Sequence, residues 1–243
     1  MAANIVMAQN YGITFGDLEV TAENAADIFG DGLASYDLEQ NQLTLQEGFD
    51  YHQSKDFVTI STGRDFHIRL EGNAEMAVCV DCGDNLFIEA SDAYTLEITS
   101  NISGSALKCP NLTVENNVSL ELLSRNSQDG MYALNCADAL TVNYASIRAE
   151  VTTARLAVAV QQLVLNESYL QKPAGGIVNP VEGGICYGDG SPAKLVRIMP
   201  DVTNLEENNV PTQNARTQKL FENGRIVIVK DGRKFNLAGQ EVH

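Results

Sequence analysis

One short pattern occurs four times in this chain, as Val-Cys-Val-Asp-Cys at residues 78–82, Ser-Ala-Leu-Lys-Cys at 105–109, Tyr-Ala-Leu-Asn-Cys at 132–136 and Leu-Ala-Val-Ala-Val at 156–160. Each copy is followed by a triplet whose first and third residues are apolar, at 86–88, 112–114, 140–142 and 163–165. The first three copies end on cysteines that are 27 residues apart. A fixed period of this size is typical of repeat architectures, and alternating apolar residues indicate strands rather than helices. The stretch predicts a coil with about three strands per turn, as in a parallel β-helix.

The common register of the four copies predicts which side chains face the core. Three inward rows are expected: Val80, Leu107, Leu134 and Val158; Cys82, Cys109, Cys136 and Val160; and Leu86, Leu112, Leu140 and Leu163. We expect the cysteines to be buried, reduced thiols, because parallel stacked side chains do not give the geometry that a disulfide needs. Cys79 and Cys82 have the spacing of some zinc and redox sites, but the sequence has no second pair or histidine cluster near them. The sequence therefore predicts no metal site and no cofactor.

The residues before the repeat predict a cap for the open end of the coil. Residues 1–48 are expected to form this N-terminal cap and a first strand. The cap would contain a hairpin around Gly16-Asp17 and a short helix at residues 21–28, with Thr21 at its N-terminus. The β-helix coils are expected over residues 49–199. The last coil would use residues 185 and 195–198, after an irregular loop at 172–190.

The residues after the repeat predict a separate C-terminal part. Residues 200–217 are polar and are expected to form a linker. Asn223-Gly224 and Asp231-Gly232 are typical of hairpin turns, so residues 218–243 are expected to form a small antiparallel β-meander. The fold class that we predict is all-β: a right-handed parallel β-helix with an N-terminal cap that contains a short helix, and a C-terminal meander.

Several of these motifs resemble a known type of module. Ser35-Tyr36-Asp37 and Leu43-Thr44-Leu45, with the Leu-Thr-Val triplets at 112–114 and 140–142, are similar to β-helical repeat modules in surface and secreted proteins of gut Bacteroidetes. Such modules are described as carbohydrate-binding-like or of unknown function. Residues 236–242 are similar to C-terminal segments of exported Bacteroidetes proteins. The resemblance implies a secreted or cell-envelope protein whose leader is absent from this sequence.

Composition and charge exclude two classes of partner. The chain has 32 acidic and 16 basic side chains, which gives a formal net charge of −16. This charge repels the phosphates of nucleic acids and of anionic membranes. The sequence has no run of 18 apolar residues, so no membrane-spanning segment is predicted. The partners that we expect are a glycan or another surface protein.

A catalytic function is one possibility for this fold, because some parallel β-helices cleave polysaccharides. Hydrolysis of a glycosidic bond needs two suitably spaced carboxyl groups, and a lyase of this fold needs a calcium site of clustered carboxylates with a basic residue. Asp81, Asp129, Asp138 and Asp189 are available, but the sequence clusters none of them with the residues of those enzymes. We therefore predict a non-catalytic module with a binding or adhesive role. A polysaccharide lyase or glycoside hydrolase, and a purely structural spacer, stay open as alternatives.

Candidate ligand-binding residues come from the predicted outer faces and turns. Asp65, His67 and Arg69 alternate with the apolar residues of the strand at 66–70, so they share one polar face that could hold a sugar or a carboxylate. The alternative is a solvated outer face. Tyr94 is an outward aromatic residue on which a sugar ring could stack, in a chain without tryptophan. The predicted ligand-binding set is Asp65, His67, Arg69, Tyr94, Asp129 and Asp189.

Overall fold

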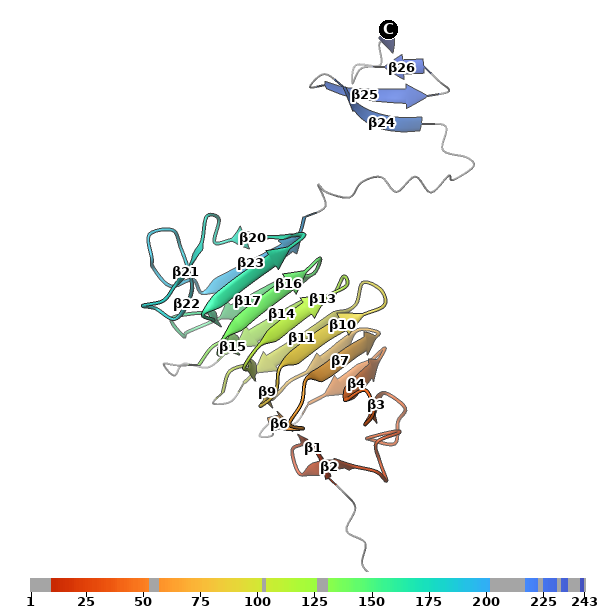
Figure 1. Ribbon diagram of the computed structural model, residues 1–243, viewed down its shortest axis with the longest axis vertical. Coiled ribbons are helices and arrows are strands. Elements are labelled where there is room, and N and C mark those ends of the chain that lie inside the picture. Colours follow the sequence, from red (N-terminus) through yellow and green to blue (C-terminus); the bar gives the residue numbers. More distant parts are fainter. Residues whose placement is uncertain are drawn as a thin grey trace, which may run out of the picture. The chain divides into compact units, whose positions relative to one another are not determined.

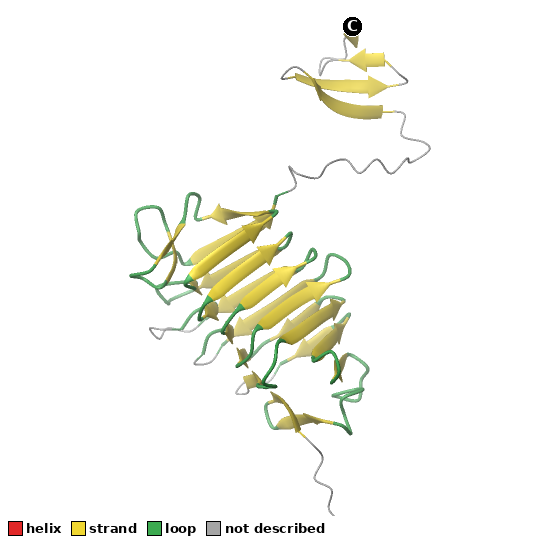
Figure 2. Ribbon diagram, in the orientation of Figure 1, coloured by secondary structure: helices red, strands yellow, loops and turns green. Residues whose placement is uncertain are grey.

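The computed structural model describes residues 10–52, 57–101, 104–125 and 131–201, together with the backbone of four strands nearer the C-terminus. The chain divides into two compact units, Met1–Thr203 and Asn204–His243. The first is a parallel β-solenoid of about five turns (Figure 1). Strands and loops make up the whole of its described part (Figure 2). Among the described residues, we find no helix with the length and apolar character that a membrane crossing requires.

Three sheets, here called A, B and C, wrap around the core of the solenoid. In spatial order, sheet A contains β2 (Leu18–Thr21), β1 (Asn10–Phe15), β6 (Phe57–Ile60), β9 (Cys79–Cys82), β12 (Leu107–Cys109), β15 (Leu134–Cys136), β18 (Val158–Ala159), β22 (Gly184–Cys186) and β21 (Ile177–Asn179). Sheet B contains β19 (Gln162–Asn166), β16 (Ala139–Asn143), β13 (Leu112–Glu115), β10 (Leu86–Ala90), β7 (Phe66–Glu71), β4 (Gln42–Gln46) and β3 (Ala34–Asp37). Sheet C contains β20 (Ser168–Lys172), β23 (Leu195–Pro200), β17 (Ser146–Val151), β14 (Ser119–Ser124), β11 (Thr95–Ser100), β8 (Ala74–Met76) and β5 (Phe49–Tyr51).

The predicted register is confirmed in the parallel strand pairs. Leu107 is opposite both Val80 and Leu134, and Leu134 is opposite Val158. The cysteine row is seen where Cys109 is opposite Cys136. The leucine row runs without a break from Leu86 through Leu112 and Leu140 to Leu163. A coil therefore uses one strand from each sheet, as the 27-residue spacing indicates.

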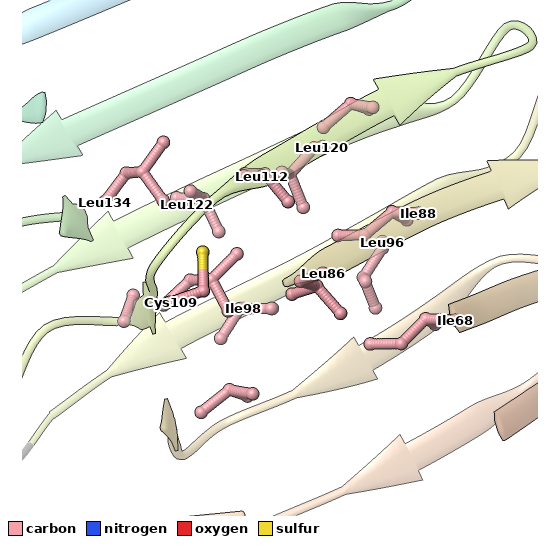
Figure 3. Packing of buried hydrophobic residues seen from close by; sticks show 14 of the residues in the cluster. Ile68, Leu86, Ile88, Leu96, Ile98, Cys109, Leu112, Leu120, Leu122 and Leu134 are labelled. Atoms are coloured by element: carbon pink, nitrogen blue, oxygen red, sulfur yellow. The ribbon is translucent and has the colours of Figure 1, made fainter. Parts of the chain in front are cut away.

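The inward rows form one continuous apolar core. Leu112, Leu120 and Leu134 are fully buried, and they come from sheets B, C and A respectively. Figure 3 shows side chains of all three sheets meeting in the interior of the coil, with the thiol of Cys109 among them. All five cysteines are buried free thiols. Burial of this apolar surface is the main driving force for folding, and each coil contributes a similar layer.

The predicted cap helix is wrong, because Thr21 ends β2 and residues 22–28 form turns and bends. One bond of the α-helical kind, four residues apart, joins the Ala25 amide to the Thr21 carbonyl at 2.9 Å. The side chain of Asn24 instead accepts from the amide of Thr21 at 2.7 Å, and that of Asp27 accepts from three amides at 30–32. The backbone of this segment also pairs with β3, since Tyr36 donates to the Ala25 carbonyl. Short polar side chains compete in this way with helix formation.

The end of the solenoid also differs from the prediction. Residues 185 and 195–198 do contribute the last strands, β22 and β23, but both run antiparallel to their neighbours β18 and β17. The loop predicted at 172–190 contains β21, which pairs with β22. Sheets A and C thus end in antiparallel pairs, β22 with β21 and β23 with β20, and not on another parallel coil. The 27-residue period gives no information about strand direction once the repeat has ended.

The second unit contains β24 (Thr217–Glu222), β25 (Arg225–Lys230), β26 (Arg233–Phe235) and β27 (Glu241–Val242). Each pairs antiparallel with the next. The turns predicted at Asn223-Gly224 and Asp231-Gly232 lie outside the described residues, as does most of the 200–217 linker. The meander as a complete motif therefore stays a prediction.

Candidate functional site

A polar groove lies on the outer face of sheet B, where β3, β4 and β7 meet. Its volume is about 670 Å³. The residues of its lining that carry polar groups are Ser35, Tyr36, Asp37, Gln40, Gln42, Thr44, Arg69 and Glu71. Those of β4 and β7 face outward because alternate residues of these strands are buried, as the pattern of Leu43, Leu45, Ile68 and Leu70 shows. The groove thus offers hydroxyl, amide, carboxylate and guanidinium groups on a rigid sheet.

Buried hydrogen bonds hold the wall of the groove in place. Asn41 is 2% exposed and has a φ of 53°, a left-handed conformation that asparagine tolerates. Its side-chain amide donates to the carbonyl of Asp65 at 2.7 Å, and its oxygen accepts from the Tyr36 hydroxyl at 2.5 Å. Burial raises the pKa of the Tyr36 phenol, and its hydrogen bond with Arg64 acts in the opposite direction. Arg64 also donates to the carbonyl of Leu38 at the rim.

An aromatic pair adjoins the groove on the same face of the sheet. The rings of His67 and Phe87, which are opposite each other on β7 and β10, have centroids 4.9 Å apart and planes 13° apart. Both residues are half-buried, so part of the pair is open to solvent. Next to His67 on β7, Arg69 forms a 3.1 Å ion pair with Glu71. Two stacked, partly exposed aromatic rings therefore lie beside charged groups that can form hydrogen bonds.

The structure brings together three of the six predicted ligand-binding residues. Asp65 immediately precedes β7, and His67 and Arg69 lie along its outer face. Arg69 lines the groove. The carboxylate of Asp65 accepts from the Asn85 side chain at 2.8 Å, and Asn85 in turn accepts from Asn111 at 2.9 Å. Asp65 therefore starts a ladder of side-chain bonds that joins successive coils.

Two of the other predicted residues lie elsewhere. Tyr94 is half-buried, and it packs against the core. Asp189 is in the loop between β22 and β23, where it accepts from the amide and hydroxyl of Ser191 at 2.9 and 2.6 Å. These bonds lower the pKa of Asp189. Asp129 lies outside the described residues.

The two thiols of the Cys-x-x-Cys segment, those of Cys79 and Cys82, contact different partners. The thiol of Cys79 contacts the Ser100 hydroxyl at 3.0 Å, whereas Cys82 donates to the carbonyl of Asp84 at 3.3 Å. Burial raises the pKa of Cys82 to about 12 and also raises that of Cys79. A metal needs the thiolate form, so this environment disfavours metal binding by the pair.

A second cluster of chemically active side chains lies on the outer face of sheet C. Asp50, His52 and Glu75 place one potential metal-ligand atom each within 4.8 Å of one another. Sequence reasoning missed this cluster because residues 50 and 75 become neighbours only through the pairing of β5 with β8. Sequence reasoning also missed the groove on sheet B, because its wall depends on the bond between the Asn41 side chain and the distant carbonyl of Asp65.

Comparison with known proteins adds no assignment. We found no match to a protein-family model, to a curated protein or to a solved structure. The β-solenoid fold of the structure supports the resemblance to β-helical modules. No relative connects the chain to gut Bacteroidetes.

Proposed function

We propose that this chain is a non-catalytic glycan-binding module of a secreted or cell-surface protein, and that the groove on sheet B is its binding site. The observation that carries the proposal is the stacked His67–Phe87 pair beside a groove lined by polar groups. The apolar C–H groups of a sugar ring can pack on the parts of the two rings that are open to solvent. Its hydroxyl groups both donate and accept hydrogen bonds, which suits the mixture of Gln42, Arg69 and Glu71.

The charge of the groove favours a neutral glycan. Asp37 and Glu71 are acidic and Arg69 is basic, so the ionisable residues of the lining do not give it a positive charge. The chain as a whole carries a formal charge of −16. Polyanionic polysaccharides would be repelled by this field. The ligand class that we propose is therefore a neutral oligosaccharide.

The location and the finer architecture belong to the same proposal. Export is supported by the resemblance of residues 236–242 to C-terminal segments of exported proteins. We propose that residues 218–243 are an appendage of that kind, folded as a meander. We also propose a right-handed coil, since crossover connections between parallel strands are right-handed in nearly all known cases.

Titration of a neutral-glycan panel against matched variants tests the binding site. The parent should give saturable binding to at least one glycan, and Arg69→Ala and Phe87→Ala should each weaken it about tenfold, the loss of roughly one charged hydrogen bond or one stacking contact. The matched control is Arg148→Ala, because Arg148 is 45% exposed on sheet C and Arg69 is 40% exposed on sheet B. Equal weakening by Arg148→Ala would contradict the site.

Product assays on the same panel separate binding from catalysis. A binding module releases no reducing ends and no unsaturated products. Release of either product by the parent chain would reject the non-catalytic assignment in favour of a glycoside hydrolase or a lyase. Absence of saturable binding to every glycan would instead favour a structural spacer.

A further inference from the structure

We propose that Asp50, His52 and Glu75 form a binding site for a divalent transition-metal ion on the outer face of sheet C. Asp50 is in β5 and Glu75 is opposite it in β8, while His52 follows β5 directly. The Nε2 atom of His52 lies 2.9 Å from Oδ1 of Asp50 and 3.0 Å from Oε1 of Glu75. One nitrogen and two carboxylate oxygens therefore converge from two coils of the solenoid.

These separations match the donor spacing of a metal centre. An ion with bonds of about 2.1 Å to nitrogen and oxygen holds neighbouring ligands about 3.0 Å apart at the 90° angle of octahedral coordination, and about 3.4 Å apart at the tetrahedral angle that Zn²⁺ prefers, so the side chains would move apart slightly to bind Zn²⁺. A single proton on Nε2 points well at one carboxylate but not at both. An ion at the common centre would instead contact all three atoms. Imidazole with carboxylates suits Zn²⁺ and Co²⁺, whereas Ca²⁺ and Mg²⁺ prefer oxygen ligands alone.

The charge of the surface around the triad also favours a bound cation. Asp50, Glu75, Glu97 and Glu121 follow one another as cross-strand neighbours. Like charges in this arrangement destabilise a sheet. Glu121 has a basic partner, Arg148, at 3.7 Å. The hollow beside the triad, of about 360 Å³, is lined by Glu47, Asp50, Glu75 and Glu97 and by no described lysine or arginine. A divalent cation would remove this repulsion.

The exposure of the three side chains shows that a bound ion would be open to solvent. The side chains of Asp50, His52 and Glu75 are 58%, 51% and 45% exposed, so three protein ligands would leave the remaining positions to water. Such a site binds and releases its ion from solution, and it does not serve as a buried structural centre. It is separate from the groove on sheet B, so it does not depend on the proposed glycan binding.

Histidine signals in the NMR spectrum of the full chain give a direct test, because the chain has three histidines. Substoichiometric Co²⁺ should shift and broaden one ring signal, and that signal should be missing in His52→Gln.

Calorimetry with Zn²⁺ should show one site, with affinity at least tenfold lower in His52→Gln, Asp50→Asn and Glu75→Gln. The controls His67→Gln and Glu121→Gln should stay within twofold of the parent. Thermal melting without metal should show that every variant is folded.

Three results would overturn the site. The first is a Co²⁺ effect on the ring of His67 or His243 and not on that of His52. The second is Zn²⁺ binding that Glu121→Gln weakens as much as Glu75→Gln, which would show a diffuse attraction to the acidic face. The third is Ca²⁺ binding as tight as Zn²⁺ binding, which would show that the imidazole is not a ligand.

Discussion

The two sides of strand β7 differ although they share one backbone. Phe66, Ile68 and Leu70 face inward and are at most 1% exposed, whereas His67 and Arg69 between them are partly open to solvent. Inward neighbours on successive coils are nearly all apolar, because every coil must fill the same core. Outward neighbours change from coil to coil and from sheet to sheet.

The outer faces of sheets B and C differ strongly in the kinds of residue that they carry. One row on sheet B joins Gln42, His67, Phe87 and Thr113, which gives an aromatic and polar surface. A row on sheet C joins Asp50, Glu75, Glu97 and Glu121, which gives an acidic surface. The same core therefore supports two outer faces with different chemistry. Stability should respond to inward changes, and binding to outward changes.

The largest expected effect is that of a charge in the core. Leu134→Asp should unfold the solenoid, because Leu134 is fully buried and an aspartate there would have no partner. A loss of more than about 4 kcal/mol in the free energy of unfolding is expected. Asn135→Asp, one residue along the same strand, should leave the far-ultraviolet circular dichroism spectrum and the melting temperature nearly unchanged. Similar melting of both variants would show that the register is wrong.

A cavity in the core should have the next largest effect. Leu112→Ala removes buried methyl groups from the leucine row, and it should lower the free energy of unfolding by about 2–5 kcal/mol. Thr113→Ala, on the outward side of β13, should change it by less than about 0.5 kcal/mol. Urea denaturation measures both. Equal losses would mean that β13 does not distinguish an inward from an outward side.

The buried thiols should make stability depend on pH in alkaline solution. Burial raises the pKa of Cys82 from 9.0 to about 12 in the folded chain. A group with a raised folded pKa contributes stability below the unfolded pKa, and this contribution is lost as pH rises toward the folded value. Above pH 9 the parent should lose about 1.4 kcal/mol more per pH unit than Cys82→Ala. Parallel pH profiles for the two proteins would contradict the assignment.

The smallest effect is expected for an exposed ion pair. Nζ of Lys108 and Oδ2 of Asp81 are 2.9 Å apart on the outer face of sheet A, with both side chains about half exposed. Solvent screens such a pair, so Asp81→Asn should cost at most about 1 kcal/mol, and less at high salt. A double-mutant cycle with Lys108→Gln measures the coupling energy. A coupling energy above 2 kcal/mol would show that outward pairs also stabilise the coil.

The inward rows could be predicted because two independent periods agree in the sequence. Alternation identifies the strands, and the 27-residue spacing of Cys82, Cys109 and Cys136 aligns them between coils. The same information placed His67 and Arg69 on one outer face. Both signals end with the repeat. The reversed direction of β22 and β23 depends on contacts at the end of the coil, so the sequence pattern did not predict it.

The parts that sequence reasoning missed depend on side chains that bind the backbone or meet across coils. Asn24 and Asp27 capture amides that a helix would have used. Asn41 shapes the groove through a bond to residue 65, far away in the sequence. Asp50 and Glu75 meet although their spacing of 25 residues differs from that of the cysteines. The local sequence pattern of apolar and polar residues does not predict these contacts.

The most direct test of the account compares two neighbours on β7, Arg69 and Leu70. Glycan affinity and the free energy of unfolding should be measured for Arg69→Ala and Leu70→Ala under one set of conditions. Arg69→Ala should lose about tenfold in affinity while its stability stays within about 0.5 kcal/mol of the parent. Leu70→Ala should lose about 2–5 kcal/mol of stability, while its folded fraction keeps the parent affinity. Affinity and stability that fall together in both variants would contradict the separation of the outer binding face from the inner core.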